Sequence, residues 1–221
     1  MKGRSDTPEA LAELLREGAA GLDVALNAGQ ISQFLIYLDE LRAWSAKSSL
    51  TAIRAPREIV LKHFVDSLAA LPHLRPGTTL LDVGSGPGLP GLALKIARPD
   101  LRLTSVESRR RKASFQEHVA RGLALEGVEV VWGRLEPDGM LLPKAAFDCA
   151  ISRAVALKDF LAAAAPYVKE GGLLLAMQGR LEETAAVAPP PGLEPAGQVA
   201  YRLPILEDER SLVLFRKNRE A

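Results

Sequence analysis

A short glycine-rich segment constrains this chain more than any other feature. Residues 80–94 read LLDVGSGPGLPGLAL and place four glycines, Gly84, Gly86, Gly88 and Gly91, within eight positions between two apolar runs. Glycine has no Cβ, so such a segment turns sharply and lets other atoms approach the bare backbone closely. The segment therefore predicts a tight strand-to-helix turn at which backbone N–H groups face a ligand.

From residue 78 onward, short apolar runs alternate with amphipathic segments. Predicted helices lie near residues 89–98, 109–124 and 157–169. The predicted strands are residues 79–83, 101–106, 128–132, 147–152, 172–177, 198–203 and 210–217. Apolar strands that alternate with helices predict an α/β fold, with a mostly parallel seven-stranded sheet flanked by helices.

The first part of the chain has a different pattern. Apolar residues at helical spacing predict a short helix ending near residues 18–21, a second over residues 31–44 and a third over residues 54–74. In the third segment the expected buried stripe is Val60, Phe64, Leu68 and Leu71. We therefore divide the chain into an N-terminal helical extension, residues 1–76, and a sheet domain, residues 77–221. Residues 187–197 are rich in Pro and Gly and are expected to be a connection outside the core.

Composition limits the class of protein. Lys and Arg number 28 against 27 Asp and Glu, so no strong overall field attracts nucleic acid, and binding to RNA would need a local patch. The single cysteine, Cys149, excludes an internal disulfide and is expected to be a buried core residue. No signal peptide, apolar run of 18 residues or metal-ligand spacing is evident. We expect a cytoplasmic protein without a metal or a membrane anchor.

Two cofactor classes match the glycine segment. Gly86-x-Gly88-x-x-Gly91, with Glu107 after the second strand, matches a dinucleotide-binding fingerprint. The other register begins at Asp82, two residues before Gly84, and is typical of S-adenosylmethionine-dependent methyltransferases. A carboxylate at Asp82 has little use beside a pyrophosphate but suits a nucleoside that carries a sulfonium and an ammonium. The sequence therefore favours the methyltransferase, and a turn without any ligand is the less favoured alternative.

Several motifs in the same order resemble one family. LTAIRAPREIVLKHFVDSL, the glycine segment and FDCAISRAVA are similar to the small-subunit ribosomal RNA guanine-N7 methyltransferases, also called glucose-inhibited division protein B. The similarity extends from about Phe34 to the C-terminus. It implies a Rossmann-like methyltransferase domain with a small helical extension. It also implies methyl transfer from S-adenosylmethionine to N7 of one guanine in 16S rRNA, within the small ribosomal subunit.

Candidate cofactor-binding residues come from the resemblance and from the sheet pattern. The resemblance places contacts on Gly84, Leu89, Leu135, Glu136 and Arg153. The pattern itself adds Glu107, at the end of the second strand, as the partner of the ribose hydroxyls. The remaining candidates lie beside these in the loop and after the second strand: Asp82, Ser85, Gly86, Gly88 and Ser108.

The chemistry of the predicted reaction asks for little beyond positioning. Guanine N7 carries a free lone pair, so no proton has to leave and orientation of the reactants can supply the catalysis. Arg153 is the candidate catalytic residue, as a positioning group rather than a general base. Candidate RNA-binding residues are the cations near the cofactor rim: Arg54, Lys62, His63, Arg109, Arg110, Arg111 and Lys112.

Some positions depart from the family pattern, and alternatives remain open. Ser45, Ala46, Ser49 and Gln178 replace residues usual in the family, which bears on how RNA docks. A nicotinamide-dependent oxidoreductase, a methyltransferase with another substrate and a non-catalytic RNA-binding module are the alternatives. The two tryptophans, Trp44 and Trp132, are expected to pack in the interior. The sequence does not determine the oligomeric state, and a monomer is expected.

Overall fold

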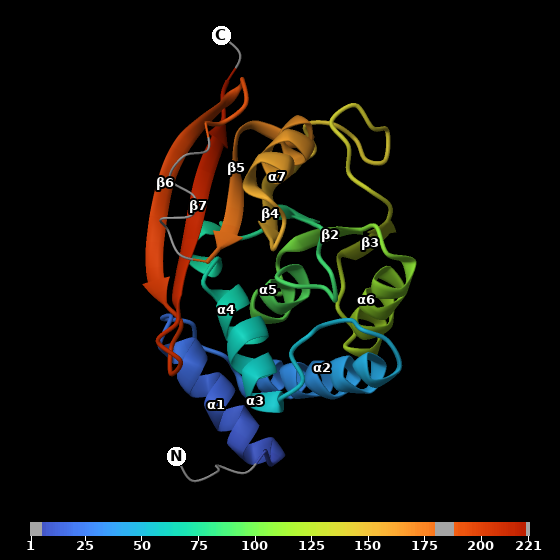
Figure 1. The fold of residues 1–221 in the computed structure, drawn as a ribbon, viewed down its shortest axis with the longest axis vertical. Coiled ribbons are helices and arrows are strands. Elements are labelled where there is room, and N and C mark those ends of the chain that lie inside the picture. The colour runs from blue at the N-terminus through green and yellow to red at the C-terminus, as the bar shows by residue number, and fades with distance from the viewer. Residues whose placement is uncertain (1–5, 180–187, 220–221) are drawn as a thin grey trace.

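Seven strands form one sheet in the order β3-β2-β1-β4-β5-β7-β6 (Figure 1). The computed structural model describes residues 6–179 and 188–219. The strands are β1 (Thr79–Val83), β2 (Arg102–Glu107), β3 (Val128–Trp132), β4 (Phe147–Arg153), β5 (Val168–Gln178), β6 (Leu193–Arg202) and β7 (Glu209–Lys217). The first five run parallel, and β7 is antiparallel to both of its neighbours. The predicted mostly parallel seven-stranded sheet is confirmed.

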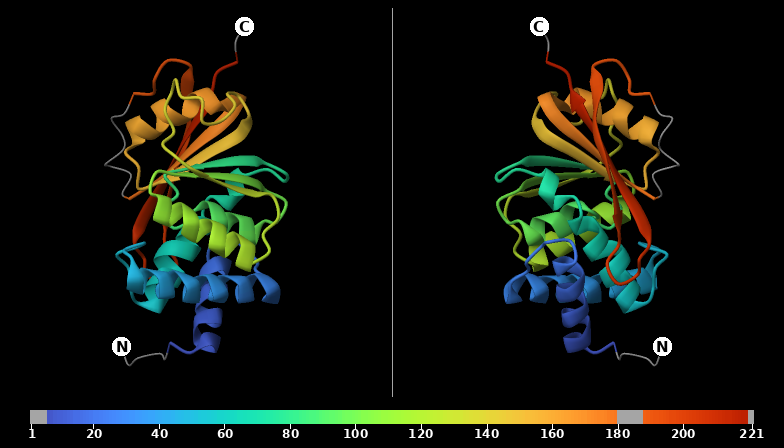
Figure 2. Two further views of the ribbon diagram at one scale, coloured as in Figure 1. Left: turned by 90° about the vertical axis from the view of Figure 1, so that its right-hand side faces the viewer. Right: turned by 90° about the vertical axis from the view of Figure 1, so that its left-hand side faces the viewer.

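Helices cover both faces of the sheet. Within the described residues, none of the helices is long and apolar enough to span a membrane. The α-helices are α1 (Pro8–Ala20), α2 (Ala28–Lys47), α3 (Pro56–Ile59), α4 (Asp66–Leu68), α5 (Gly91–Ala97), α6 (Arg110–Gly122) and α7 (Leu157–Ala164), with 3-10 turns at η2 (Leu71–His73) and η3 (Ala165–Tyr167). Helix α7 lies on one face, and α5 and α6 lie on the other with α1 and α2 beyond them (Figure 2).

The N-terminal helices share their core with the sheet domain. Phe34 and Phe64, from the first part of the chain, belong to one buried cluster with Phe115 of α6 and Leu92 of α5. Phe64 is fully buried, and its ring centroid lies 5.1 Å from that of Phe34. Within the described residues, no separate core forms on the N-terminal side. The division of the chain at residue 76 stays a prediction.

The third predicted helix is interrupted. Between α3 and α4 the backbone forms a π-helical segment, η1 (Val60–Val65), so residues 54–74 are not one regular α-helix. A π turn displaces carbonyl groups from the usual i to i+4 pattern, and such turns are common at functional sites. The carbonyls of Lys62 and His63 accept hydrogen bonds from Arg153, which lies 90 residues after His63 in the sequence. The predicted buried stripe from Val60 to Leu71 is confirmed.

Two further expectations about the sheet domain need correction. Strand β6 begins at Leu193, inside the stretch expected to be a connection, and residue 187 of that stretch lies outside the described residues. A register shift between Pro195 and Gly197 explains why both residues are tolerated, since an edge strand with a bulge does not need every N–H. Strand β5 begins at Val168, so the preceding helix ends earlier than the expected residue 169.

We expect Phe64→Ala to lower the free energy of unfolding by about 3–5 kcal/mol, because it leaves a cavity in the core shared by both parts of the chain. Because that core is continuous, we also expect one cooperative transition in urea. Unfolding followed by circular dichroism and by tryptophan fluorescence measures both. Two separate transitions in the wild type would contradict the shared core.

Candidate cofactor and substrate site

The glycine loop between β1 and α5 is held in place by buried side chains from four elements. Glu107, at the end of β2, accepts a hydrogen bond from Gly86 N at 2.8 Å. Gln116 of α6, fully buried, donates to Gly86 O at 2.7 Å, and Tyr37 of α2 donates to Pro87 O at 2.5 Å. Asp82 accepts from Gly91 N at 2.7 Å. The loop is therefore fixed on both sides by hydrogen bonds before any ligand arrives.

Gly84, at the start of this loop, must be a glycine for two reasons. Its φ of +68° lies in the left-handed region, which side chains disfavour. A Cβ at this position would also lie 2.8 Å from Val155 Cγ2. The residue is nevertheless exposed, so its backbone is open to a ligand.

Two cavities meet at Gly84. The first, of about 430 Å³, is lined by Val83, Gly84, Val106, Ser108, Gly133, Arg134, Leu135, Glu136, Val155, Asp159, Phe160 and Ala163. The second, also about 430 Å³, is lined by Leu50, Thr51, Ile53, Lys62, His63, Asp66, Gly84, Ser85, Gly86, Pro87, Leu89, Glu107, Lys112, Arg153, Ala154 and Arg210. Both lie at the carboxyl ends of parallel strands, where open α/β sheets bind their ligands.

The two cavities differ in chemistry. The first is mostly apolar, with Leu135 and Phe160 among its walls and the carboxylate of Glu136 beside them. The second contains the cations Lys62, Lys112 and Arg153. An elongated ligand with an aromatic ring at one end and charged groups at the other would match the pair, with its middle over Gly84.

Most of the predicted cofactor residues come together here. Gly84, Ser85, Gly86, Leu89, Glu107, Ser108, Leu135, Glu136 and Arg153 all line one or both cavities. Gly88 lies behind the loop, where a Cβ would come within 2.4 Å of Leu92 Cδ1. Asp82 is fully buried and lines neither cavity. Burial raises the pKa of the Asp82 carboxyl to about 7, and its Oδ1 has no hydrogen-bond partner among the residues that the structure describes.

Arg153 is anchored in a network that sequence patterns did not indicate. Its Nη1 donates to Asp66 Oδ2 at 3.2 Å and to the displaced carbonyls of Lys62 and His63. Asp66 Oδ1 accepts from the hydroxyl of Tyr201 at 2.9 Å, and Arg210 Nε lies 3.7 Å away. The network thus joins α4, β4 and the β6–β7 hairpin, and it fixes the guanidinium at the wall of the second cavity.

His63 is neutral in this network. Its Nδ1 lies 3.3 Å from Arg153 Nη2, which can only donate, so Nδ1 accepts and Nε2 carries the proton toward Thr51 Oγ1 at 2.7 Å. Burial lowers the pKa of the imidazole from 6.5 to about 3, and the charge of Arg153 adds to the shift. A neutral His63 adds no positive charge for RNA, unlike the cation that the sequence suggested.

The other predicted RNA contacts divide into two groups. Lys62 and Lys112 line the second cavity, and Lys62 also pairs with Glu58 at 2.7 Å. The exposed residues Arg54, Arg109, Arg110 and Arg111 line neither cavity. Arg54 donates to Ser45 O at 2.8 Å, and Arg110 lies over the ring of Trp132 at 5.2 Å.

Structure corrects one further expectation. Trp132 does not pack in the interior, because it is 56% exposed at the end of β3. Strand β3 is the sheet edge beyond β2, where an outward ring meets solvent. Trp44 does pack, edge-on against Phe115 at 5.4 Å, and Cys149 is buried as expected. Among the described residues no group of His, Cys, Asp and Glu has the arrangement of a metal site.

Known proteins similar to this chain agree on one family. The family model for GidB, rRNA small subunit methyltransferase G, matches residues 30–213. The chain belongs to this family. A relative from Myxococcus xanthus, named ribosomal RNA small subunit methyltransferase G, is 42% identical over 205 residues, which cover 90% of this chain and 93% of that protein. One of the same name from Burkholderia ambifaria is 38% identical over 210 residues, covering 93% and 92%.

Solved structures support the fold. TrmN from Thermus thermophilus superposes with a TM-score of 0.56 at 16% identity, over 72% of this chain and 53% of that one. A SAM-dependent methyltransferase from Aquifex aeolicus gives a TM-score of 0.55 at 18% identity, over 76% and 97%. The family decides between the two registers of the glycine segment, in favour of the methyltransferase and against the dinucleotide-binding enzyme.

Because the ring is buried and Arg153 faces its Nδ1, we expect His63 to remain a neutral imidazole with the proton on Nε2 at pH 5. Nitrogen-15 NMR of histidine-labelled protein measures this. In Arg153→Gln the guanidinium charge is gone, so the pKa of His63 should rise, although burial still holds it below 6.5. A His63 that titrates near 6.5 in the wild type would contradict the network.

Proposed function

We propose that this protein transfers the methyl group of S-adenosylmethionine to N7 of a guanine in 16S rRNA. The observation that carries the proposal is the pair of cavities that meet at Gly84, in a chain that belongs to the rRNA small subunit methyltransferase G family. The substrate we expect is the small ribosomal subunit, in the cytoplasm, with the enzyme acting as a monomer.

The residues present suit S-adenosylmethionine. The first cavity would take the adenine between Leu135 and Phe160, and Ser108 and Glu136 offer polar groups to its edge. Glu107 is held by Gly86 N and by Arg109 N, and a carboxylate has further lone pairs for ribose hydroxyls. The bare backbone at Gly84 permits the close approach that a Cβ would prevent. When bound, the cofactor supplies an electrophilic methyl group on a positively charged sulfur.

Asp82 supports the site from behind. Its carboxylate accepts from Gly91 N at the start of α5 and thereby sets the direction of that helix relative to β1. A direct contact between Asp82 and the cofactor stays a prediction. In the geometry described, the residue acts on the loop that holds the cofactor.

The protein's part in the reaction is to position the two reactants. Guanine N7 needs no deprotonation, so the cavity needs no general base, and its histidine is neutral and bonded to Thr51 and Arg153. Transfer of the methyl group would move the positive charge of the cofactor to the base, so the residues of the site would have little new charge to stabilise. Arg153, fixed by Asp66 and the π-segment carbonyls, presents a planar guanidinium that can stack on the base or hold a phosphate.

A methyl-transfer assay tests the proposed reaction. We expect tritium from labelled S-adenosylmethionine to enter the 16S rRNA of unmodified small subunits, at one guanine that becomes sensitive to cleavage specific for 7-methylguanine. Subunits that already carry the modification are the control and should take up no label. Incorporation elsewhere than at a guanine N7, or none with a protein that binds the cofactor, would refute the proposal.

We expect Gly84→Asp to abolish binding of S-adenosylmethionine, because the new side chain meets Val155 and occupies the junction of the two cavities. Isothermal titration calorimetry measures the binding. Gly192→Asp is the matched control, since Gly192 also has a positive φ, of +84°, but no atom of the described residues lies within 4 Å of its Cβ position. Normal cofactor affinity in the folded Gly84→Asp protein would disprove the placement of the cofactor.

A further inference from the structure

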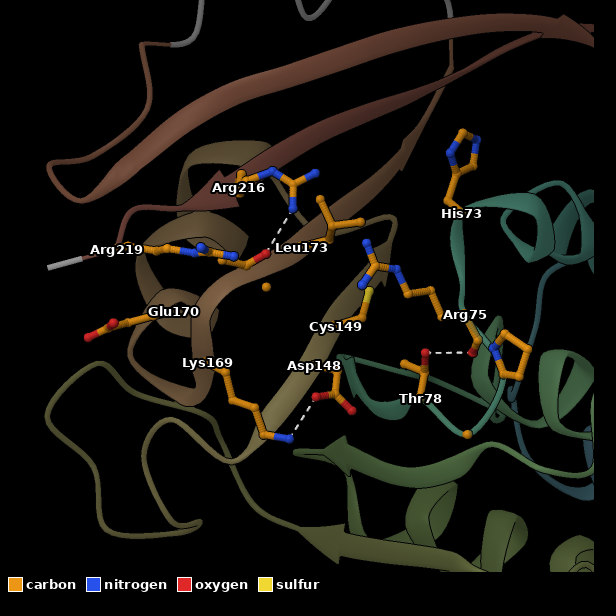
Figure 3. Close-up of a pocket in the computed structure, with 14 residues that line it drawn as sticks. His73, Arg75, Thr78, Asp148, Cys149, Lys169, Glu170, Leu173, Arg216 and Arg219 are labelled. Carbon is orange, nitrogen blue, oxygen red and sulfur yellow. Dashed lines mark hydrogen bonds and ion pairs between the residues drawn. The ribbon is translucent and has the colours of Figure 1, made fainter.

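A third cavity lies at the other end of the parallel strands from the glycine loop, and the proposed reaction does not use it. It has a volume of about 350 Å³ and opens between the start of β1, the starts of β4 and β5 and the end of β7 (Figure 3). The glycine loop lies at the carboxyl ends of the parallel strands, whereas this cavity lies at their amino ends. Strands of five to seven residues rise about 3.3 Å per residue, so the two sites lie on the order of 20 Å apart.

Four cationic side chains from distant parts of the chain line this cavity. They are Arg75, before β1, Lys169 at the start of β5, and Arg216 and Arg219 near the end of the chain. Two carboxylates, Asp148 and Glu170, also line it. The four cations and two carboxylates that line the cavity leave an excess of two positive charges, in a protein whose formal net charge is only +1.

The carboxylates do not neutralise the guanidinium groups. Asp148 is committed to Lys169 Nζ at 2.6 Å and to Thr79, whose N and Oγ1 donate to its Oδ2. Arg216 Nη1 donates to Gly171 O at 2.8 Å. Within residues 6–179 and 188–219, the guanidiniums of Arg75 and Arg219 have no hydrogen-bond acceptor. Several uncompensated cations in one cavity repel one another, which favours binding of an anion.

The shape of the cavity favours a phosphate. The guanidinium groups of Arg75 and Arg216 point into it from opposite walls (Figure 3). Gly171, with a φ of +71°, lets Arg219 lie close to the backbone, since its Nε is 3.2 Å from where a Cβ would be. Guanidinium forks match the oxygens of a phosphate in pairs, and an opposed set can contact one phosphate from two sides.

We propose that this cavity binds a backbone phosphate of the rRNA, about 20 Å from the methylated base. The inference rests on the proposed function, because a polyanionic RNA substrate supplies the phosphate. A protein with a net charge of +1 needs local patches to hold RNA, and this cavity is such a patch on a side of the protein away from the cofactor. A free nucleotide offers the same phosphate chemistry and is the alternative source.

The double variant Arg75→Gln/Arg219→Gln tests the proposal. We expect its affinity for unmodified small subunits to fall about tenfold in a filter-binding assay, with a salt slope reduced by about 1–2, because up to two phosphate contacts are lost. Affinity for S-adenosylmethionine should not change. The control Arg16→Gln/Arg42→Gln removes two exposed cations from α1 and α2 and should bind as the wild type does.

A second variant guards against loss of folding. Arg219→Glu changes one exposed residue that follows β7, and we expect it to weaken subunit binding at least as much as the double variant while the protein melts normally. Wild-type affinity and salt slope in both variants would overturn the inference. Loss of AMP binding in calorimetry, with subunit binding unchanged, would also overturn it and identify a free nucleotide as the ligand.

The two proposals fail separately. A wild-type protein that binds subunits through Arg75 and Arg219 but transfers no methyl group counts against the proposed reaction alone. A wild-type protein that methylates 16S rRNA, while both variants bind subunits as the wild type does, counts against the phosphate site alone.

Discussion

The structure depends on hydrogen bonds that fix the glycine loop. A segment rich in glycine has many accessible conformations, and ordering it costs more entropy than ordering other residues. Hydrogen bonds to the backbone of the loop offset this entropy loss. They come from side chains of four elements: Glu107, Gln116, Tyr37 and Asp82. The loop therefore has its shape before a ligand binds, and the two cavities on either side of Gly84 follow from that shape.

A second network couples the helical segment to the sheet. Asp66 holds Arg153 and Tyr201, so one carboxylate connects α4 with β4 and with the β6–β7 hairpin. Side chains of Asp66 and Arg153 are only 7% and 17% exposed, and a charge buried this far is costly unless it is paired. Removal of Asp66 would leave the guanidinium of Arg153 without its carboxylate partner, whereas removal of Arg153 would leave Asp66 with Arg210 and the hydroxyl of Tyr201. The π segment contributes the carbonyls of Lys62 and His63, which accept hydrogen bonds from Arg153.

The predictions from sequence agree with the structure where local interactions determine an element, and they differ where long-range contacts do. Strands β1, β2 and β4 are short apolar runs that are buried almost throughout, and the helices α6 and α7 bury one face each, so a local pattern reports them directly. The predicted boundaries of helices and strands were wrong where long-range contacts determine them. One case is η1, whose carbonyls accept hydrogen bonds from Arg153. The other is β6, which continues past Pro195 because of a bulge. The prediction that Trp132 packs in the interior was wrong because β3 is an edge strand of the sheet. The sequence of β3 itself does not show that it lies at the edge.

The sequence by itself determined the α/β order, the position of the glycine loop, the acid at Glu107 and the family. Each of these is written in contiguous residues or in a short spacing along the chain. Only the tertiary structure decided that Asp82 lies behind the loop, that His63 is a neutral partner of Arg153, and that Arg75, Lys169, Arg216 and Arg219 share one cavity. Their meeting depends on how the strands are ordered in the sheet, and residues about 140 positions apart, such as Arg75 and Arg216, leave no periodic signal of that contact.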